Sequence, residues 1–369
     1  MAHLRKHPRN DRPQVRWRDP ATGKEHAKTF LRVTDAKEFK KKLEYELSRG
    51  IFVDPRDAKT SFGEWSETWK SSWLHLSDNT VLQRESLLRS HLLPSFGDMA
   101  IGHITQPNVQ SWVTALKNAG YAPWTIDNSY RLLKAAMDGA VVAGLIQSSP
   151  CVGVRKPSVH KDRKEMHFLS PEELGRLAAE VGDLAPLVLL SGWLGLRWGE
   201  VRGLRRKRLN VLKAELLVEE QLIEPQGNLR VAPLKTAASR RRLAIPSFLN
   251  DTLNDHLAAG DCGSDDLVFV GRDGAALRNH WVRRHFKPAV VRAGLASSFR
   301  FHDLRHTCAA FLIHQGAGQY ELQRFLGHAS PRTTWENYGH LFAGYEERLS
   351  HRLEDLYATS LGVSSVVGS

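Results

Sequence analysis

The chain has 369 residues, 41% of them hydrophobic, so it is long enough for two or three domains with real cores and is not a disordered tail protein. It contains no run of about 18 apolar residues, and no apolar stretch follows its basic start, which argues against a membrane span and a secretory signal peptide. Its 52 lysines and arginines against 40 acidic residues give a net charge of +12, which favours a polyanionic partner, nucleic acid before membrane.

The first 59 residues are strongly basic and predict a small sheet followed by one helix. They hold 16 lysines and arginines against 9 acidic residues, so 7 of the 12 net positive charges lie here. Residues 14–18 alternate as a strand does, and residues 27–33 read as the returning strand after a turn. A helix is expected from about residue 34 to Gly50. Such a basic sheet could bind in a DNA groove. The alternative is that these residues form a charged appendage that is only solvated. The candidate DNA contacts are Arg16, Trp17, Arg18 and Lys28.

Residues 62 to about 144 predict a bundle of four or five short helices, after a polar linker around Asp54 and Pro55. Trp65, Trp69 and Trp73 recur every four residues, which puts them on one face of a helix. This spacing favours core packing over base stacking.

A second basic stretch, residues 150–164, predicts a linker to the rest of the chain that could lie along a phosphate backbone. Its candidate DNA contacts are Arg155 and Lys156. The following Ser170-Pro-Glu-Glu173 has the pattern of a capping box with proline at the first helical position, which predicts a helix start.

Beyond that point, helices alternate with one β-rich insert from about residue 214 to 246, with a hairpin turn at residues 225–228. The chain is therefore expected to be mainly α with small β elements, an α+β fold. It ends in small, polar residues, 359–369, that predict a mobile tail.

Four groups of residues in the last 180 can carry chemistry. Arg197 lies between an apolar helix and a new one, where it can be a buried partner of Glu200 or cradle a phosphate at the helix N-terminus. Lys235 lies where the β-rich insert turns. A lysine at a hairpin tip is ordinarily just solvated, but it could also reach into a DNA groove and donate a proton. Lys213 and Arg240 stand nearby as alternatives.

The third group, His302 and Arg305, stands at the start of a predicted helix. Since each helical residue turns the chain by about 100°, the two side chains lie about 60° apart around the helix and can face the same ligand. His-Asp here would suit a metal-dependent phosphohydrolase, but further metal-spaced histidines and aspartates are missing. The three cysteines, Cys151, Cys262 and Cys308, are widely spaced, which is typical of a reduced cytosolic protein without a disulfide framework or zinc site. No metal site is predicted.

The fourth group is His328 and Tyr338. His328 follows Gly327, which is the predicted end of a helix, and Tyr338 comes ten residues later. By spacing alone, Tyr338 would be a core tyrosine on an apolar helical stripe.

The order of these groups resembles the tyrosine recombinase and phage integrase family: arginine, lysine in a β-turn, His-x-x-Arg, Leu-Gly-His, and tyrosine before Gly-His. The resemblance spans residues 168–356. It implies an arm-type DNA-binding domain at 1–58, a helical, SAM-like core-binding domain at 59–157 and a mixed α/β catalytic domain at 163–358.

The resemblance also implies roles for single residues in breaking a phosphodiester without metal, ATP or cofactor. Tyr338 resembles the nucleophile that forms a 3′-phosphotyrosyl bond. Arg197 and Arg305 resemble the clamp on the non-bridging oxygens, and Lys235 resembles the general acid for the leaving 5′ oxygen. The supporting residues are His302 and His328, as donors to the phosphate, with His302 also able to assist proton transfer, and Glu200, which holds Arg197.

The partners that the resemblance implies are double-stranded attachment sites of core and arm type, three further protomers in a tetramer on DNA, a DNA-bending accessory factor and an excisionase. The expected location is the cytoplasm of a bacterial host, at the nucleoid. Leu349, Leu353 and Leu356 form an apolar face that fits packing on a neighbouring protomer or on the same chain. The rival functions are a type IB topoisomerase and a DNA-binding regulator that has lost catalysis.

Overall fold

The protein is described from a computed structural model. The structure describes residues 2–18, 23, 25–48, 57–158, 167–260, 262–342, 350, 353, 354 and 357. The chain divides into two compact units, Met1–Arg163 and Lys164–Ser369. The predicted tail at 359–369, the linker residues Asp54 and Pro55, and Leu349 and Leu356 of the apolar face lie outside the described residues.

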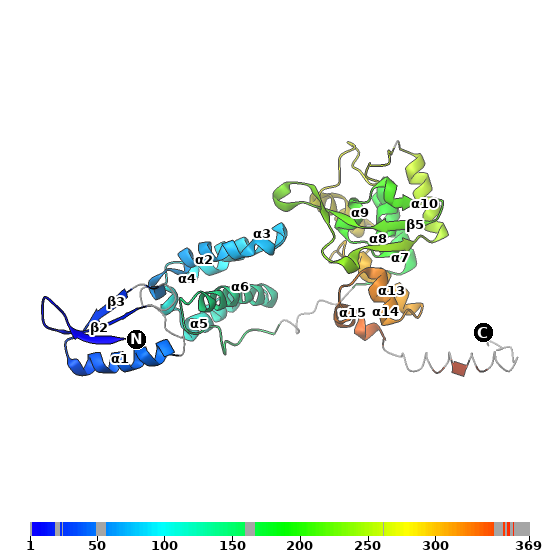
Figure 1. The fold of residues 1–369 in the computed structure, drawn as a ribbon. Helices are drawn as coiled ribbons and strands as arrows, with labels where there is room; N and C mark the ends of the chain where they lie inside the picture. Colours follow the sequence, from blue (N-terminus) through cyan, green and yellow to red (C-terminus); the bar gives the residue numbers. More distant parts are fainter. Residues whose placement is uncertain are drawn as a thin grey trace. The chain divides into compact units, whose positions relative to one another are not determined.

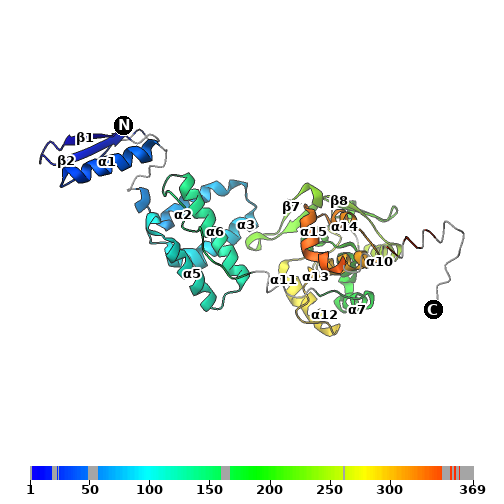
Figure 2. The ribbon, with the colours of Figure 1, turned by 90° about the horizontal axis from the view of Figure 1, so that it is seen from below.

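The chain begins with a three-stranded antiparallel sheet in the order β1-β2-β3, and one helix packs across one of its faces (Figure 1, Figure 2). The strand over 14–18 and the helix are confirmed, whereas the first strand was not predicted and the returning strand begins and ends earlier than expected. The elements are β1 (His3–Lys6), β2 (Pro13–Arg18), β3 (Glu25–Thr29) and α1 (Val33–Ser48). Val15 and Trp17 of β2 face the helix and pack with Ala36 and Leu43 in a small core.

A helical bundle follows, and its core contains the tryptophan series. Trp65, Trp69 and Trp73 are buried, which confirms core packing. The indole N–H of Trp65 donates to the Ala136 carbonyl, and a Cβ at Gly139 would lie 3.0 Å from Nε1 of Trp69, so the helices can approach closely only with glycine there. The helices are α2 (Phe62–Lys70), α3 (Asp78–Leu87), α4 (Leu93–Phe96), α5 (Gln106–Asn118) and α6 (Pro123–Val142), with the π-turn η3 (Leu88–Leu92) between α3 and α4.

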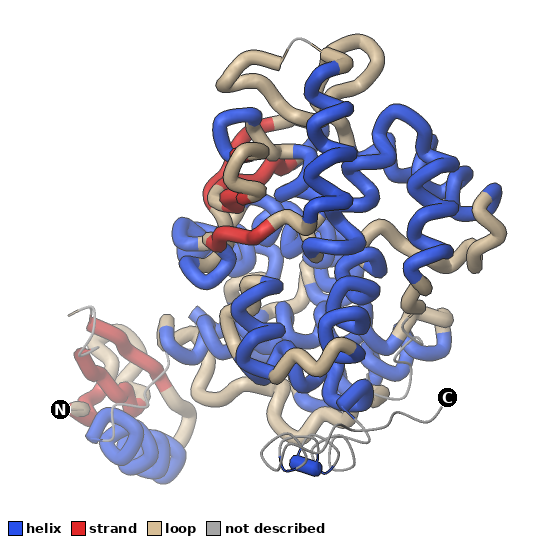
Figure 3. The backbone as a smooth tube through the Cα atoms, turned by 90° about the vertical axis from the view of Figure 1, so that its right-hand side faces the viewer, coloured by secondary structure: helices blue, strands red, loops and turns tan. Residues whose placement is uncertain are grey.

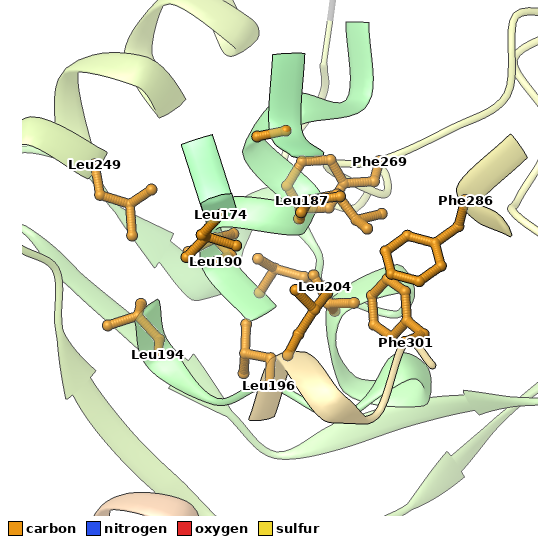
Figure 4. Close-up of a cluster of buried hydrophobic side chains, with 14 of the residues drawn as sticks. Leu174, Leu187, Leu190, Leu194, Leu196, Leu204, Leu249, Phe269, Phe286 and Phe301 are labelled. Carbon is orange, nitrogen blue, oxygen red and sulfur yellow. The ribbon is translucent and has the colours of Figure 1, made fainter. Parts of the chain in front are cut away.

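The second unit begins with a pair of apolar helices, α7 (Pro171–Val181) and α8 (Ala185–Leu194). The predicted capping box at Ser170 is present, since its hydroxyl accepts from the Glu173 N–H. The segment Pro171–Leu194 passes a length and composition test for a membrane span, but half of the tested window is buried within the protein. Leu174, Leu187, Leu190 and Leu194 pack into the main core of this unit (Figure 4).

The rest of the second unit places small sheets beside helices, and strands make up a minor part of the described chain (Figure 3). The strands are β4 (Leu209–Asn210), β5 (Glu215–Val218), β6 (Glu220–Ile223), β7 (Arg230–Pro233) and β8 (Arg241–Ala244), in sheets β4-β5-β8 and β6-β7. The predicted turn at 225–228 is confirmed, because β6 and β7 pair across it. The helices are α9 (Trp198–Arg202), α10 (Ser247–Ala258), α11 (Asn279–Trp281), α12 (Lys287–Arg292), α13 (Asp303–His314), α14 (Gln319–Leu326) and α15 (Pro331–Tyr338).

Candidate active site

Arg197 stands at the start of α9 and is held by Glu200. Gly195 ends α8 in the left-handed conformation, with φ of 66°, and this turns the chain so that Arg197 caps the next helix. Nη1 of Arg197 lies 2.6 Å from Oε1 of Glu200, and its Nη2 donates to the Gly327 carbonyl at 3.4 Å. The side chain of Arg197 is one-third exposed, so its guanidinium group remains accessible to an anion.

Glu200 also binds Arg241, a residue that the sequence did not single out. Nη2 of Arg241 lies 3.0 Å from Oε2 of Glu200, and both side chains are buried. Burial alone would raise the pKa of Glu200, but Arg241 and Arg197 outweigh it and lower the pKa to about 2. The carboxylate is therefore charged at neutral pH and ties β8 to the start of α9.

Arg305 lies on α13 and is 1% exposed. Its Nη1 donates to the Gly195 carbonyl at 2.6 Å and its Nη2 to the Leu326 carbonyl, so the ends of α8 and α14 hold it. Burial, with the nearby charges of Arg197 and Arg241, lowers the pKa of Arg305 to about 9. The guanidinium group therefore stays positive at neutral pH.

His328 follows the left-handed Gly327 that ends α14, as predicted, and is buried. Its Nδ1 lies 2.9 Å from Oγ1 of Thr334, and its ring lies parallel to that of Tyr338, with centroids 6.3 Å apart and an angle of 10°. Burial, followed by the charges of Arg305 and Arg197, lowers the pKa of His328 to about 3. The ring is therefore neutral and can donate one hydrogen bond.

Tyr338 ends α15 and is 1% exposed, in a small core with Cys308, Leu322 and Leu326. Its Oη lies 2.7 Å from Nδ1 of His306. Burial raises the pKa of Tyr338 to about 12, so the phenol is protonated at neutral pH.

His306 was missed by the sequence reasoning, although a signal for it was present. It follows by four residues His302, which caps the start of α13, and this spacing puts the two side chains next to each other. Their rings lie 5.0 Å apart at 89°. Part of the His302 side chain is exposed, but the protein atoms around its ring remove water from it, and this desolvation, together with the charges of His306 and Arg305, lowers the pKa of His302.

Lys235 lies where the β-rich insert turns between β7 and β8, as expected, but this turn is not the tip of a hairpin, because β7 and β8 belong to different sheets. The tip is formed by residues 225–228, whereas Lys235 is exposed in the connection between β7 and β8. Among the described residues, no hydrogen bond or ion pair joins Lys235 to the other candidates. Arg240, one of the two alternatives, is paired with Glu219 at 3.1 Å, and Lys213 is exposed in the turn between β4 and β5.

The candidate DNA contacts of the first sheet lie on its two different faces. Trp17 does not fit that role: it is 6% exposed, stacks on His26 at 5.4 Å and contacts Phe39 of α1, because odd-numbered residues of β2 face the helix. Lys28 pairs with Val15 in register and lies 4.8 Å from the Phe39 ring, on the helix side. Arg16 and Arg18 lie on the opposite, open face, where Arg18 is exposed and Arg16 is half-buried and pairs with Glu25 at 3.2 Å.

In the linker after the bundle, Lys156 has a structural partner. Its ammonium group pairs with Asp127 of α6 and lies 4.5 Å from the Tyr130 ring. The backbone of Arg155 is bound to Gln110 through two hydrogen bonds, while its side chain is exposed. Arg155 therefore remains the more available of the two for DNA.

The arrangement brings Arg197, Arg305, His328 and Tyr338 together from four helical segments, with Glu200 behind Arg197. Arg305 and Arg197 are close enough to act electrostatically on the Tyr338 hydroxyl, and two positive guanidinium groups so placed suit the binding of a phosphate diester and attack on its phosphorus. No group of three or more His, Cys, Asp or Glu with metal-site geometry occurs within the part of the chain that the structure describes.

Comparison with known proteins gives matches across most of the chain. Residues 176–344 match the model of the phage integrase family, and residues 61–117 match that of the phage integrase N-terminal SAM-like domain, together more than half of the chain. A putative prophage phiRv2 integrase of Mycobacterium tuberculosis is 28% identical over 357 residues, which cover 92% of this chain and 93% of that protein. The ICEBs1 integrase of Bacillus subtilis is 25% identical over 291 residues, which cover 75% of this chain and 78% of that protein.

Solved structures share the fold. The Tn1549 transposon integrase in complex with transposon right end DNA has a TM-score of 0.68 at 21% identity, covering 79% of this chain and all of that one. A lambda integrase tetramer bound to a Holliday junction has a TM-score of 0.57 at 18% identity, covering 89% of this chain and 96% of that one. The expected fold class is confirmed. On these matches, the chain belongs to the phage integrase family of tyrosine recombinases, and it is a site-specific recombinase that cleaves and rejoins DNA.

Proposed function

We propose that Tyr338 attacks a DNA phosphate, releases the 5′ hydroxyl and forms a 3′-phosphotyrosyl bond, and that this reaction integrates and excises a phage or other mobile element. The covalent bond conserves the energy of the phosphodiester until a 5′ hydroxyl of the other duplex attacks it. The observation that carries this proposal is the convergence of Arg197, Arg305 and His328 on Tyr338.

The two arginines have complementary roles in this mechanism. Arg305 is fixed by two carbonyl oxygens, so it presents its charge in one position, whereas Arg197 is partly exposed and reaches the phosphate from the surface. Together they neutralise the charge that develops on the phosphorane, and a preorganised pair does so without reorganisation cost. Glu200 fixes Arg197 without cancelling both positive charges.

The remaining residues supply hydrogen bonds and one proton. His302 and His328 donate to the non-bridging oxygens. Lys235 protonates the leaving 5′ oxygen after its connection between β7 and β8 approaches the DNA. Because Tyr338 is buried in the free protein, the mechanism also requires that DNA binding expose its Oη to the phosphorus.

The partners of this reaction are core-type attachment sites, bound by residues 59–157 and 163–358, and arm-type sites, bound by residues 1–58. Four protomers assemble on two DNA sites, as in the lambda integrase tetramer bound to a Holliday junction. A DNA-bending accessory factor and an excisionase complete the complex, which acts at the nucleoid in the cytoplasm. For arm DNA, Arg16 and Arg18 are the contacts that the open sheet face favours.

A suicide substrate tests the proposal directly. Purified protein is mixed with a library of nicked DNA fragments in EDTA, and covalent adducts are separated on a denaturing gel and mapped by peptide. The wild type should yield DNA linked to the peptide that contains Tyr338, while Tyr338→Phe should bind the same DNA and yield no adduct. Tyr320→Phe is the matched control, because Tyr320 is exposed on α14 and should leave the adduct unchanged. An adduct from Tyr338→Phe, or none from a wild type that binds DNA, would overturn the assignment.

A further inference from the structure

The hydroxyl of Tyr338 has one hydrogen-bond partner within the described residues, and that partner is none of the six residues assigned to the reaction above. It is His306, whose Nδ1 lies 2.7 Å from Oη. Both side chains are buried, and their ring centroids lie 5.5 Å apart at 64°, so the imidazole meets the phenol through its edge.

We propose that His306 is the base that accepts the proton of Tyr338 during DNA cleavage. This inference rests on the proposed role of Tyr338 as the nucleophile. The O–H bond of Tyr338 breaks and its proton moves to Nδ1 of His306, while Oη forms a bond to phosphorus. The bond from phosphorus to the 5′ oxygen breaks, and that oxygen takes a proton from the general acid. When the strand is rejoined, His306 returns the proton to Tyr338.

The geometry distinguishes His306 from the other two histidines of the site. The ring of His328 lies parallel to that of Tyr338, and its Nδ1 is already engaged by Thr334. His302 contacts His306 edge to face and makes no contact with Tyr338 among the described interactions. Among these three histidines, His306 is therefore the one whose ring nitrogen lies within hydrogen-bonding distance of the Tyr338 hydroxyl oxygen.

The charge state of both groups fits a transfer in this direction. Burial lowers the pKa of His306, so the ring is neutral at neutral pH, and in the tautomer that carries its proton on Nε2 the Nδ1 atom accepts from Tyr338. The charged groups around it are Asp303, which opposes this shift, and Arg300 and Arg305, which reinforce it. The pKa of Tyr338 is raised to about 12, so the phenol loses its proton only during the attack itself. A base in contact with Oη then accelerates the reaction by about 100- to 10,000-fold.

The first test is His306→Gln, in which the amide can hydrogen-bond to the phenol but cannot take its proton. Single-turnover cleavage of the nicked substrate should become slower by about 100-fold or more. In the wild type, protonation of His306 should also slow cleavage as the pH falls, and this part of the pH dependence should be absent from His306→Gln. DNA affinity should stay as in the wild type. The matched control is His314→Gln on the same helix, which is exposed and should cleave at the wild-type rate. Wild-type cleavage by His306→Gln, with an adduct still at Tyr338, would overturn the role of His306 and leave the nucleophile assignment intact.

A second measurement separates proton transfer from packing and does not depend on the folding of the His306 variant. Replacing Tyr338 by a fluorinated tyrosine lowers the pKa of the phenol. With His306 present, cleavage at neutral pH should change little, because the base already removes the proton; a large acceleration would overturn the proposal. In His306→Gln, the same replacement should restore much of the lost rate, and no rescue in a folded, DNA-binding variant would assign His306 to packing instead. If wild-type protein formed no adduct at Tyr338, the proposed function itself would fail.

Discussion

At the scale of single residues, one carboxylate organises the charge of the site. Glu200 binds Arg197 on its own helix turn and Arg241 on β8, so it joins two segments while itself 3% exposed. The first pair was predictable, because the two residues lie three apart at a helix start. The second was not, because Arg241 lies 41 residues further along the chain and only the pairing of β8 with β5 brings it near.

Glu200→Gln should reduce both stability and cleavage. It leaves Arg241 buried without its counter-charge, which costs about 3–5 kcal/mol, and it frees Arg197 from the position in which it meets the phosphate. Chemical denaturation and single-turnover cleavage measure the two effects. Glu215→Gln is the control, since Glu215 pairs with Arg242 at the surface and should cost no more than about 1 kcal/mol.

The stabilisation by Glu200 should also depend on pH in a defined direction. The pKa of Glu200 is lowered from 4.5 to about 2 on folding, so its contribution is complete above pH 4.5 and is lost as pH falls toward 2. The difference in unfolding free energy between wild type and Glu200→Gln should therefore shrink by about 3 kcal/mol across that window. A difference that stays constant across the window would contradict the lowered pKa.

At the scale of elements, the ends of helices position the arginines. The last carbonyls of a helix lack partners within it, and here Arg305 takes those of Gly195 and Leu326 while Arg197 takes that of Gly327. Both Gly195 and Gly327 adopt positive φ, which lets α8 and α14 end sharply beside the site. The helix ends were readable from glycine and capping patterns. The carbonyl partners were not, since they depend on how three helices meet.

Gly327→Ala should therefore impair the site more than its local strain suggests. A Cβ there would lie 3.0 Å from the Ala238 carbonyl oxygen and 3.1 Å from Cα of Ser239, so β8 and its approach must shift away from α14. Gly294→Ala is the matched control: it also has positive φ, but its Cβ would meet no atom within 4 Å. Each substitution should cost about 1–2 kcal/mol for the backbone conformation, and only Gly327→Ala should cost more and slow cleavage. Equal effects of the two variants on denaturation and cleavage would refute the close approach.

At this scale the sequence predicted regular helices better than connections. Capping boxes and the periodic tryptophans are local signals, so the start of α7 and the core of the bundle were predicted correctly. Strand β1 was missed, and so was the placement of the two strands flanking Lys235 in different sheets, because strand pairing joins residues that are distant in the sequence. The sequence predicted Trp17 as a DNA contact, whereas alternation along β2 puts it in the core.

At the scale of the whole molecule, the positive charge is divided unevenly between the parts of the chain. The first 59 residues carry 7 of the 12 net positive charges, and the sheet within them has its own small hydrophobic core. The catalytic candidates all lie beyond residue 190. This separation predicts that binding of arm DNA and cleavage of core DNA can be removed independently.

Deleting residues 1–58 should abolish binding to arm-type sites and leave cleavage of isolated core sites near the wild-type rate. The salt dependence of DNA binding should weaken as well, because each lost phosphate contact lowers the slope of log affinity against log salt by about 0.9.

Within the full chain, replacing Arg16 and Arg18 by alanine should weaken arm binding, since both lie on the open sheet face. Lys28→Ala is the matched control: its ammonium group lies over Phe39 on the helix side, and arm binding should change less. These outcomes are measured by gel shift over a range of salt and by adduct formation on core DNA. Arm binding that survives the deletion would place arm recognition elsewhere in the chain, and loss of core cleavage would show that the first sheet takes part in assembling the catalytic complex.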